Sequence, residues 1–238
     1  MKLDILAFGA HPDDVELGAG ATIAKEISLG KKVGIVDLTR GELGTRGSAD
    51  LRDKESANAA KILGASVREN LGFADGFFIN DKNHQLEIIK MIRKYQPEIV
   101  LCNAIDDRHI DHPKGSTLVS DACFLSGLIK IETELNGENQ QKWRPKQVYH
   151  YIQWKNITPD FVVDITGFME AKKASVMAYS SQFYDPKSDE PETPITSKNF
   201  TESIEYRAKD LGRIIGVDYA EGFTSERYVA IENLSKLI

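Results

Sequence analysis

Short apolar runs alternate with longer segments of helical pattern along this chain, and that alternation constrains its fold more than any other feature. Residues 3–9, 32–38 and 98–103 are apolar runs with the length of a buried strand, and each is followed by a segment of helical composition. A strand that returns parallel to its predecessor needs a crossover, which is usually a helix. The pattern therefore predicts an α/β fold with a mostly parallel sheet and helices on both faces.

The remaining elements follow from the same signals. Residues 132–146 are predicted to form an exposed loop, and residues 185–199, which hold three prolines, are predicted to form a mobile lid. At 238 residues the chain is within the size of one core, so residues 1–238 are expected to form a single domain. The predicted strands are residues 3–9, 32–38, 67–73, 98–103, 147–152, 161–165 and 227–231, and the predicted helices are residues 16–29, 49–63, 85–95, 114–128, 167–179 and 201–215.

Charge and hydropathy exclude several classes of partner. The formal net charge is -6, which provides no basic surface for nucleic acid, so a small molecule is the more natural ligand. No apolar run approaches the length of a membrane span, and the first ten residues lack the features of a signal peptide. The two cysteines, Cys102 and Cys123, lie in apolar segments and are expected to be buried, reduced thiols. A cytoplasmic protein without membrane contact is expected.

Two polar clusters follow predicted strands. His11, Asp13 and Asp14 come directly after the first strand, and residues 106–112, with sequence Asp-Asp-Arg-His-Ile-Asp-His, come after the fourth. In parallel sheets, ligands bind at the carboxyl ends of strands, and a first and a fourth strand can be neighbours where the strand order reverses. Either cluster alone could be an ordinary helix cap or surface turn, but together they indicate one site.

The residue types of these clusters suit metal chemistry. His11, Asp14 and His112 can supply two imidazoles and a carboxylate, which is a known catalytic zinc set that leaves one position open for water. The same donors also suit iron(II), cobalt or manganese. Asp13 would then be free to take a proton from that water. One zinc ion per chain is the expected cofactor.

Further side chains can complete such a site. His109 could stabilise an oxyanion or protonate a leaving amine, and Asp111 could orient a histidine. Arg108 could hold an anionic or hydroxyl-rich substrate, and Arg52 could bind sugar hydroxyls or a carboxylate. Gly18 and Gly20 do not form a dinucleotide-binding loop, because the histidine and the aspartates occupy the place where its glycines should lie.

The two motifs Ala10-His11-Pro12-Asp13-Asp14 and His109-Ile110-Asp111-His112 resemble the PIG-L/LmbE-like family of zinc deacetylases. The resemblance implies a Rossmann-like sheet, zinc-dependent hydrolysis of the acetamide of an N-acetylglucosamine conjugate, and a homo-oligomer, either a hexamer or a trimer. By motif, it implies His11, Asp14 and His112 as metal ligands, Asp13 as base and His109 as oxyanion or acid partner. It also implies that Arg52 and Asp75 contact the sugar.

Residues 39–47 and 219–223 resemble the bacillithiol-biosynthesis branch of that family, whose substrate is N-acetylglucosaminyl malate. Arg46, Arg52 and Arg108 favour an anionic aglycone such as malate. The alternatives are a deacetylase or amidase that acts on another amino-sugar or thiol conjugate, and a non-catalytic module that binds a metal or a nucleotide.

Overall fold

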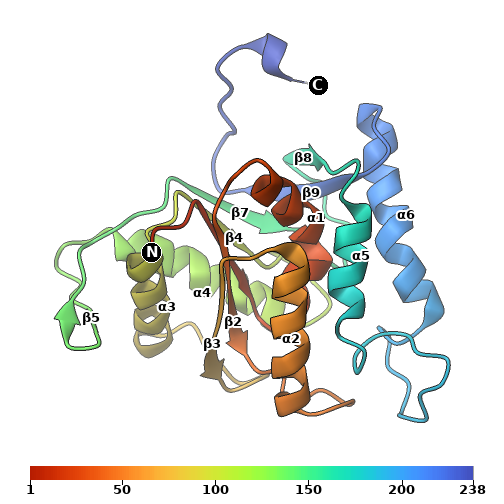
Figure 1. Cartoon of the computed structure of the whole chain (residues 1–238). Coiled ribbons are helices and arrows are strands. Elements are labelled where there is room, and N and C mark those ends of the chain that lie inside the picture. Colours follow the sequence, from red (N-terminus) through yellow and green to blue (C-terminus); the bar gives the residue numbers. More distant parts are fainter. Residues whose placement is uncertain (238) are drawn as a thin grey trace.

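The computed structural model describes residues 1–237 and contains a seven-stranded sheet with helices on both faces (Figure 1). The strand order is β3-β2-β1-β4-β7-β9-β8, and every strand is parallel to its neighbours except β9, which is antiparallel to β7 and β8. This confirms the predicted fold class. The strands of this sheet are β1 (Ile5–Gly9), β2 (Val33–Thr39), β3 (Val67–Phe73), β4 (Ile99–Cys102), β7 (Gln147–Tyr151), β8 (Phe161–Asp164) and β9 (Ala220–Ser225).

The helices divide between the two faces of the sheet (Figure 1). One face is covered by α3 and α4, and the other by α1, α2, α5 and α6. No helix within residues 1–237 is long and apolar enough to cross a membrane. The helices are α1 (Asp14–Ser28), α2 (Ala49–Leu63), α3 (Lys82–Tyr95), α4 (Asp111–Ser126), α5 (Met169–Met177) and α6 (Lys198–Ile215), followed by the short 3₁₀ helix η1 (Leu234–Lys236).

The central strands are apolar on both faces because helices cover both faces. All residues of β1 and β2 are buried. Leu6 and Phe8 pack against α3 and α4, whereas Ile5 and Ala7 pack toward α1. This alternation along β1 follows from the strand period of two, and it divides the core into one apolar layer on each side of the sheet.

The strand order reverses between β1 and β4. β1 pairs with β2 on one side and with β4 on the other, where Ile5, Leu6 and Ala7 are opposite Ile99, Val100 and Leu101. The carboxyl ends of these two strands therefore meet at the topological switch point, where open α/β sheets bind ligands. As the sequence predicted, the two polar clusters emerge side by side.

Three differences from the predicted elements have physical reasons. The prediction of a last strand at residues 227–231 was wrong. The last strand is Ala220–Ser225, because this segment pairs antiparallel with β7 and β8. The predicted loop 132–146 contains a small hairpin of β5 (Glu134–Leu135) and β6 (Glu138–Asn139). Helices α3 and α6 begin about three residues earlier than predicted, because Asp81 and Ser197 cap them.

A buried ion-pair network joins helix α1 to the neighbouring strands β2 and β3. The Arg68 guanidinium donates to both carboxylate oxygens of Asp37, at 2.7 and 2.8 Å, and to Oε1 of Glu16 at 2.5 Å. The Tyr179 hydroxyl also donates to Glu16, at 3.0 Å. The side chains of Arg68, Asp37 and Glu16 are at most 7% exposed. Removal of the arginine would leave two buried carboxylates without their counter-charge.

We expect Arg68→Ala to lower the free energy of unfolding by about 3–5 kcal/mol, because breaking a buried pair leaves its partners uncompensated. The measurement is denaturant unfolding followed by circular dichroism. Arg40→Ala is the matched control, since Arg40 pairs with the exposed Asp50 and Asp53 and its loss should change stability little. Equal stability losses in the two variants would contradict a structural role for the Arg68 network.

Candidate functional site

A cavity of about 500 Å³ opens at the carboxyl ends of β1 and β4. All but one of the predicted site residues line it. The exception is Asp111, which is fully buried beneath His11. The predicted residues that line the cavity are His11, Asp13, Asp14, Arg46, Arg52, Asp75, Arg108, His109 and His112.

The turn from β1 into α1 is tight and places two carboxylates at the cavity. A Cβ at Gly9 would lie 2.9 Å from the His11 carbonyl oxygen, so only glycine allows the chain to fold back this closely. Asp13 has φ 113° and ψ -24°, a conformation that side chains rarely adopt and that costs about 1–3 kcal/mol. The strain turns Asp13 toward the cavity as a neighbour of Asp14.

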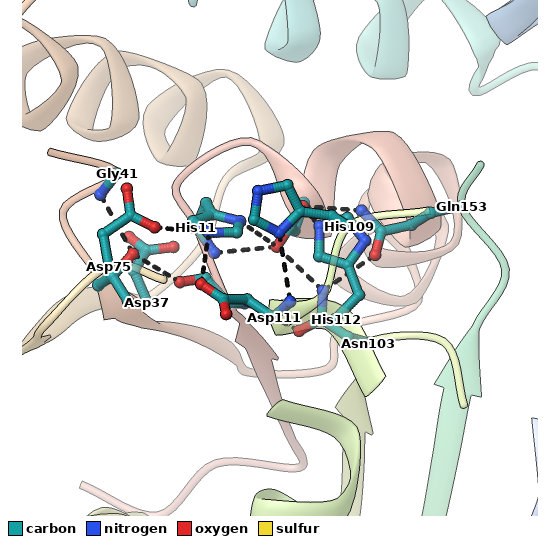
Figure 2. A network of polar contacts seen from close by, with 12 residues as sticks. His11, Asp37, Gly41, Asp75, Asn103, His109, Asp111, His112 and Gln153 are labelled. Carbon is teal, nitrogen blue, oxygen red and sulfur yellow. Dashed lines mark hydrogen bonds and ion pairs between the residues drawn. The ribbon is translucent and has the colours of Figure 1, made fainter. Parts of the chain in front are cut away.

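Three histidine rings converge at this edge of the sheet, as Figure 2 shows. The ring centroids of His11 and His109 are 4.6 Å apart, those of His109 and His112 are 5.2 Å apart, and those of His11 and His112 are 5.6 Å apart. His11, His109 and His112 each offer a nitrogen within 4.8 Å of the others, and His11, Asp75 and Asp111 form a second such group. The two sequence clusters therefore form one potential metal centre.

Hydrogen bonds on the far side of two rings decide which nitrogens face the centre. His112 Nδ1 lies 2.6 Å from the Asp107 carboxylate, so Nδ1 donates to Asp107 and Nε2 is the nitrogen that faces the centre. His11 Nε2 lies 3.1 Å from Asp75 and 3.4 Å from Asp111, which leaves Nδ1 as the free nitrogen. Both of these nitrogens face Asp14, whose carboxylate oxygens lie 3.1 Å from His112 Nε2 and 3.5 Å from His11 Nδ1, and they donate to it when the rings are protonated.

The Asp14 carboxylate is held in place by neutral donors. The Asn103 amide and the backbone N–H of His11 both donate to Oδ2 at 2.9 Å, and the Gln153 amide donates to Oδ1 at 2.8 Å. Burial alone would raise the pKa of Asp14, but the two histidines hold it well below its usual range. Asp14 is therefore a fixed anion at the centre of the site.

His109 is oriented differently from the other two histidines. The backbone N–H of Asp111 donates to His109 Nδ1 at 3.3 Å, which favours the tautomer with the proton on Nε2. Burial and the positive charge of the neighbouring histidines lower the pKa of His109, so its ring is neutral. A neutral ring with its proton on Nε2 can donate a hydrogen bond, and without that proton it could join His11 and His112 as a ligand.

The electrostatics of the centre suit a cation. Burial alone would lower the pKa of His11, yet hydrogen bonds to Asp111, Asp14 and Asp75 raise it well above its ordinary value. For His112, Asp14 and Asp107 likewise overcome burial and raise the pKa to about 9. Buried negative charge of this kind needs a positive partner. When both rings are neutral, His11 Nδ1, His112 Nε2 and the Asp14 carboxylate fit a divalent metal ion in that position.

Asp13 differs from Asp14 in its surroundings. It lines the cavity but does not cap α1 with its side chain. Burial raises the pKa of Asp13 to about 7, with Arg52 opposing the effect and the negative charge of Asp14 adding to it. The pair thus consists of one firmly ionised carboxylate and one that can exchange a proton near neutral pH, which is the property of a general base.

The three arginines occupy different parts of the cavity rim. Arg46 donates to the carbonyl oxygens of Glu190 and Pro191, at 2.9 and 2.7 Å, and so holds the predicted lid segment 185–199. Arg52 bonds to the side chain of Gln182. Arg108 lies over the Trp154 ring, 4.6 Å from its centroid. All three still line the cavity.

Several residues of the site have no role in the sequence prediction. Asp107 was part of the second cluster, but nothing in the spacing showed that it would orient His112. Asn103 directly follows β4 and Gln153 lies two residues after β7, so the same strand-end rule that located the histidines could have found them. Trp154 and Phe200, which stack with ring centroids 5.3 Å apart at the cavity, come from distant segments and gave no signal.

Comparison with known proteins places these residues in a family. Residues 6–123 match the PIG-L family, described as GlcNAc-PI de-N-acetylase. The chain is 30% identical to the diacetylchitobiose deacetylase of Thermococcus kodakarensis over 75% of this chain and 70% of that protein. It is 28% identical to the 4-oxalmesaconate hydratase of Pseudomonas putida over 74% of this chain and 73% of that protein. A shorter segment, 45% of this chain, is 44% identical to the uncharacterised deacetylase YaiS of Escherichia coli and spans 61% of it.

The fold agrees with the sequence match along the whole chain. The crystal structure of the conserved protein TT1542 from Thermus thermophilus superposes with a TM-score of 0.87 at 35% identity, and the match covers 98% of this chain and 99% of that one. The family match begins in β1 and ends in α4, so it contains both motifs of the candidate site. The chain belongs to the PIG-L family.

Proposed function

We propose that the chain is a zinc-dependent N-deacetylase that hydrolyses the acetamide of an N-acetylglucosamine conjugate. The observation that carries the proposal is the convergence of His11 Nδ1, Asp14 and His112 Nε2 beside Asp13, which lines the same cavity. Two deacetylases among the relatives support the reaction class. The site offers metal ligands, a base and a neutral donor, which amide hydrolysis requires together.

His11, Asp14 and His112 would hold the metal ion, which when bound polarises the amide carbonyl and lowers the pKa of a water molecule. Asp13 accepts a proton from the water that attacks the carbonyl carbon. The Nε2–H of His109 donates to the carbonyl oxygen as negative charge develops there. The carbon–nitrogen bond then breaks, Asp13 returns its proton to the leaving nitrogen, and acetate and the free amine result.

Hydration of a carbon–carbon double bond is the second candidate, favoured by the similarity to a hydratase at nearly the same identity as to the deacetylase. Both reactions need an activated water and a base beside it, so the site geometry alone serves either one. Only amide hydrolysis releases acetate, and acetate release therefore distinguishes the two candidates.

Removal of the base tests the role of Asp13. We expect Asp13→Asn to lower kcat by about 100-fold to 10,000-fold, because the attacking water loses its proton acceptor. The measurement is acetate release under saturating substrate, with bound metal determined in the same samples. Asp106→Asn is the control, since Asp106 is exposed and pairs with the exposed Lys155. Near-normal turnover in Asp13→Asn with metal bound would remove Asp13 as the base.

Metal content tests the ligand set independently of turnover. We expect the wild-type chain to retain about one zinc ion after dialysis, and His112→Ala to retain far less, because an imidazole donor is lost. Asp107→Asn should weaken zinc affinity by about 10-fold to 100-fold through the orientation of His112. His84→Ala, on α3 beside Asp81, should keep its zinc. Full zinc content in His112→Ala would exclude this ligand set.

Within the deacetylase reaction, we infer that the aglycone is anionic, with N-acetylglucosaminyl malate of the bacillithiol pathway as the specific substrate. The similarity of residues 39–47 and 219–223 to that branch supports this, as do Arg52 and Arg108 at the cavity. We expect faster acetate release from the malyl conjugate than from N-acetylglucosamine. Equal kcat/KM values for the two substrates would leave the deacetylase and remove the malate assignment.

A further inference from the structure

The cavity extends well beyond the metal centre, along helix α6. Phe200, Ile204, Ala208 and Leu211 line it at spacings of three or four residues, so one face of α6 follows it for three turns. At 1.5 Å per residue, the stretch from Phe200 to Leu211 is about 16 Å long. An acetyl group at the metal centre would reach only the beginning of this extension.

The opposite wall of the extension is also apolar and contains small residues. Leu17 and Gly18 of α1 contribute to it, together with Ile152 after β7 and Gly222 of β9. A Cβ at Gly222 would lie 3.2 Å from a methyl group of Leu211 and 3.3 Å from one of Ile152, so the walls come together there. We call this extension the α6 arm and define it by Leu17, Ile152, Ile204, Ala208 and Leu211.

Two charged side chains beside the α6 arm pair with each other, and a third, Arg207, donates to the carbonyl oxygen of Lys155 at 3.5 Å. Lys172 donates to Glu221 at 2.5 Å and to the carbonyl oxygen of Leu17 at 2.7 Å. Glu221 also accepts from the backbone N–H groups of Ala21 and Thr22, at 3.2 and 2.8 Å. Both side chains are at most 5% exposed. This pair is therefore internally neutralised, and it does not call for a charged ligand in the arm.

Polar and apolar walls lie on different sides of the metal centre. Arg52, Asp75 and Gln182, which come from the segments that follow β2, β3 and α5, form the polar side. The α6 arm forms the apolar side. An amide bound at the centre has a hydroxyl-rich sugar on its nitrogen and a hydrocarbon group on its carbonyl carbon. Each half matches one wall, since hydroxyls need hydrogen-bond partners and hydrocarbon does not.

We propose that the α6 arm binds the acyl chain of the substrate and that this protein hydrolyses N-acyl amino sugars whose acyl groups are longer than acetyl. This inference rests on the proposed amide hydrolysis and extends its substrate class. The bond changes are the same: water adds to the carbonyl carbon, the carbon–nitrogen bond breaks, the nitrogen takes the proton, and a fatty acid is released with the free amine.

A length series tests the proposal. N-acetyl-, N-butanoyl-, N-hexanoyl- and N-octanoylglucosamine are compared by release of the free amine. We expect kcat/KM to rise by about fourfold for each added methylene until the arm is filled, as burial of apolar surface predicts. Alkyl glycosides of N-acetylglucosamine form the parallel series. A rise with the length of the glycoside chain and not with the acyl chain would overturn the assignment.

Two substitutions on α6 separate the arm from the rest of the helix. Ala208→Leu places a larger side chain in the arm, and we expect the ratio of octanoyl to acetyl kcat/KM to fall at least tenfold. Leu211→Ala should raise that ratio by lengthening the arm. Asp210→Leu is the matched control, because Asp210 is on the exposed surface of the same helix. Thermal unfolding of each variant confirms that it is folded, and an unchanged ratio in folded Ala208→Leu would overturn the proposal.

The outcomes separate this inference from the proposed function. Hydrolysis of the acetyl substrate with a flat or falling length series would keep the deacetylase and exclude the acyl assignment. If no amide is hydrolysed, the proposed function fails. Calorimetric binding of octanoate and acetate then tests separately whether the α6 arm binds an acyl chain. Tighter binding of octanoate than of acetate, lost in Ala208→Leu, would support acyl binding in the α6 arm. Equal binding of the two acids would exclude it.

Discussion

The Asp14 carboxylate is the interaction on which the site depends. A buried anion must be satisfied by hydrogen bonds and by positive charge, and here its donors come from four different parts of the fold. They are the turn after β1, the ends of β4 and β7, and the first turn of α4. These donors reach Asp14 because β1, β4 and β7 are neighbours and end at the same edge of the sheet. The position of one carboxylate thus requires the order β1-β4-β7.

The central strands β1, β2 and β4 could be predicted because they are buried on both faces. Such strands are continuous apolar runs that stand out from the amphipathic helices between them, and the polar clusters that interrupt them mark the sheet edge. β9 was missed because its sequence, Ala-Glu-Gly-Phe-Thr-Ser, is neither apolar nor alternating. Glu221 within it is buried by its pairing with Lys172 on α5, which is a tertiary contact that no local pattern contains.

The same limit applies inside the site. Both motif clusters were visible, because histidine and aspartate at a strand end have few structural explanations. The orientation of each histidine ring depends on partners up to 64 residues away, such as Asp75 beside His11. Spacing assigned Asp111 to a histidine without saying which one, and the structure places it at His11 while Asp107 holds His112. Local sequence therefore indicates which groups are present, and the packed sheet determines which nitrogen each one presents.

The chemistry and the selectivity of the site come from different parts of the chain. The turn after β1 and the loop after β4 provide the proposed metal ligands and base, and both lie within the segment that matches the family. Most of the arm and residues 185–199, which Arg46 contacts, lie beyond residue 150 and outside that segment. Relatives named as deacetylase and as hydratase can share the first part because activated water serves both reactions. What this chain accepts as substrate must then be determined largely by its second half, where α6 and β9 enclose the cavity.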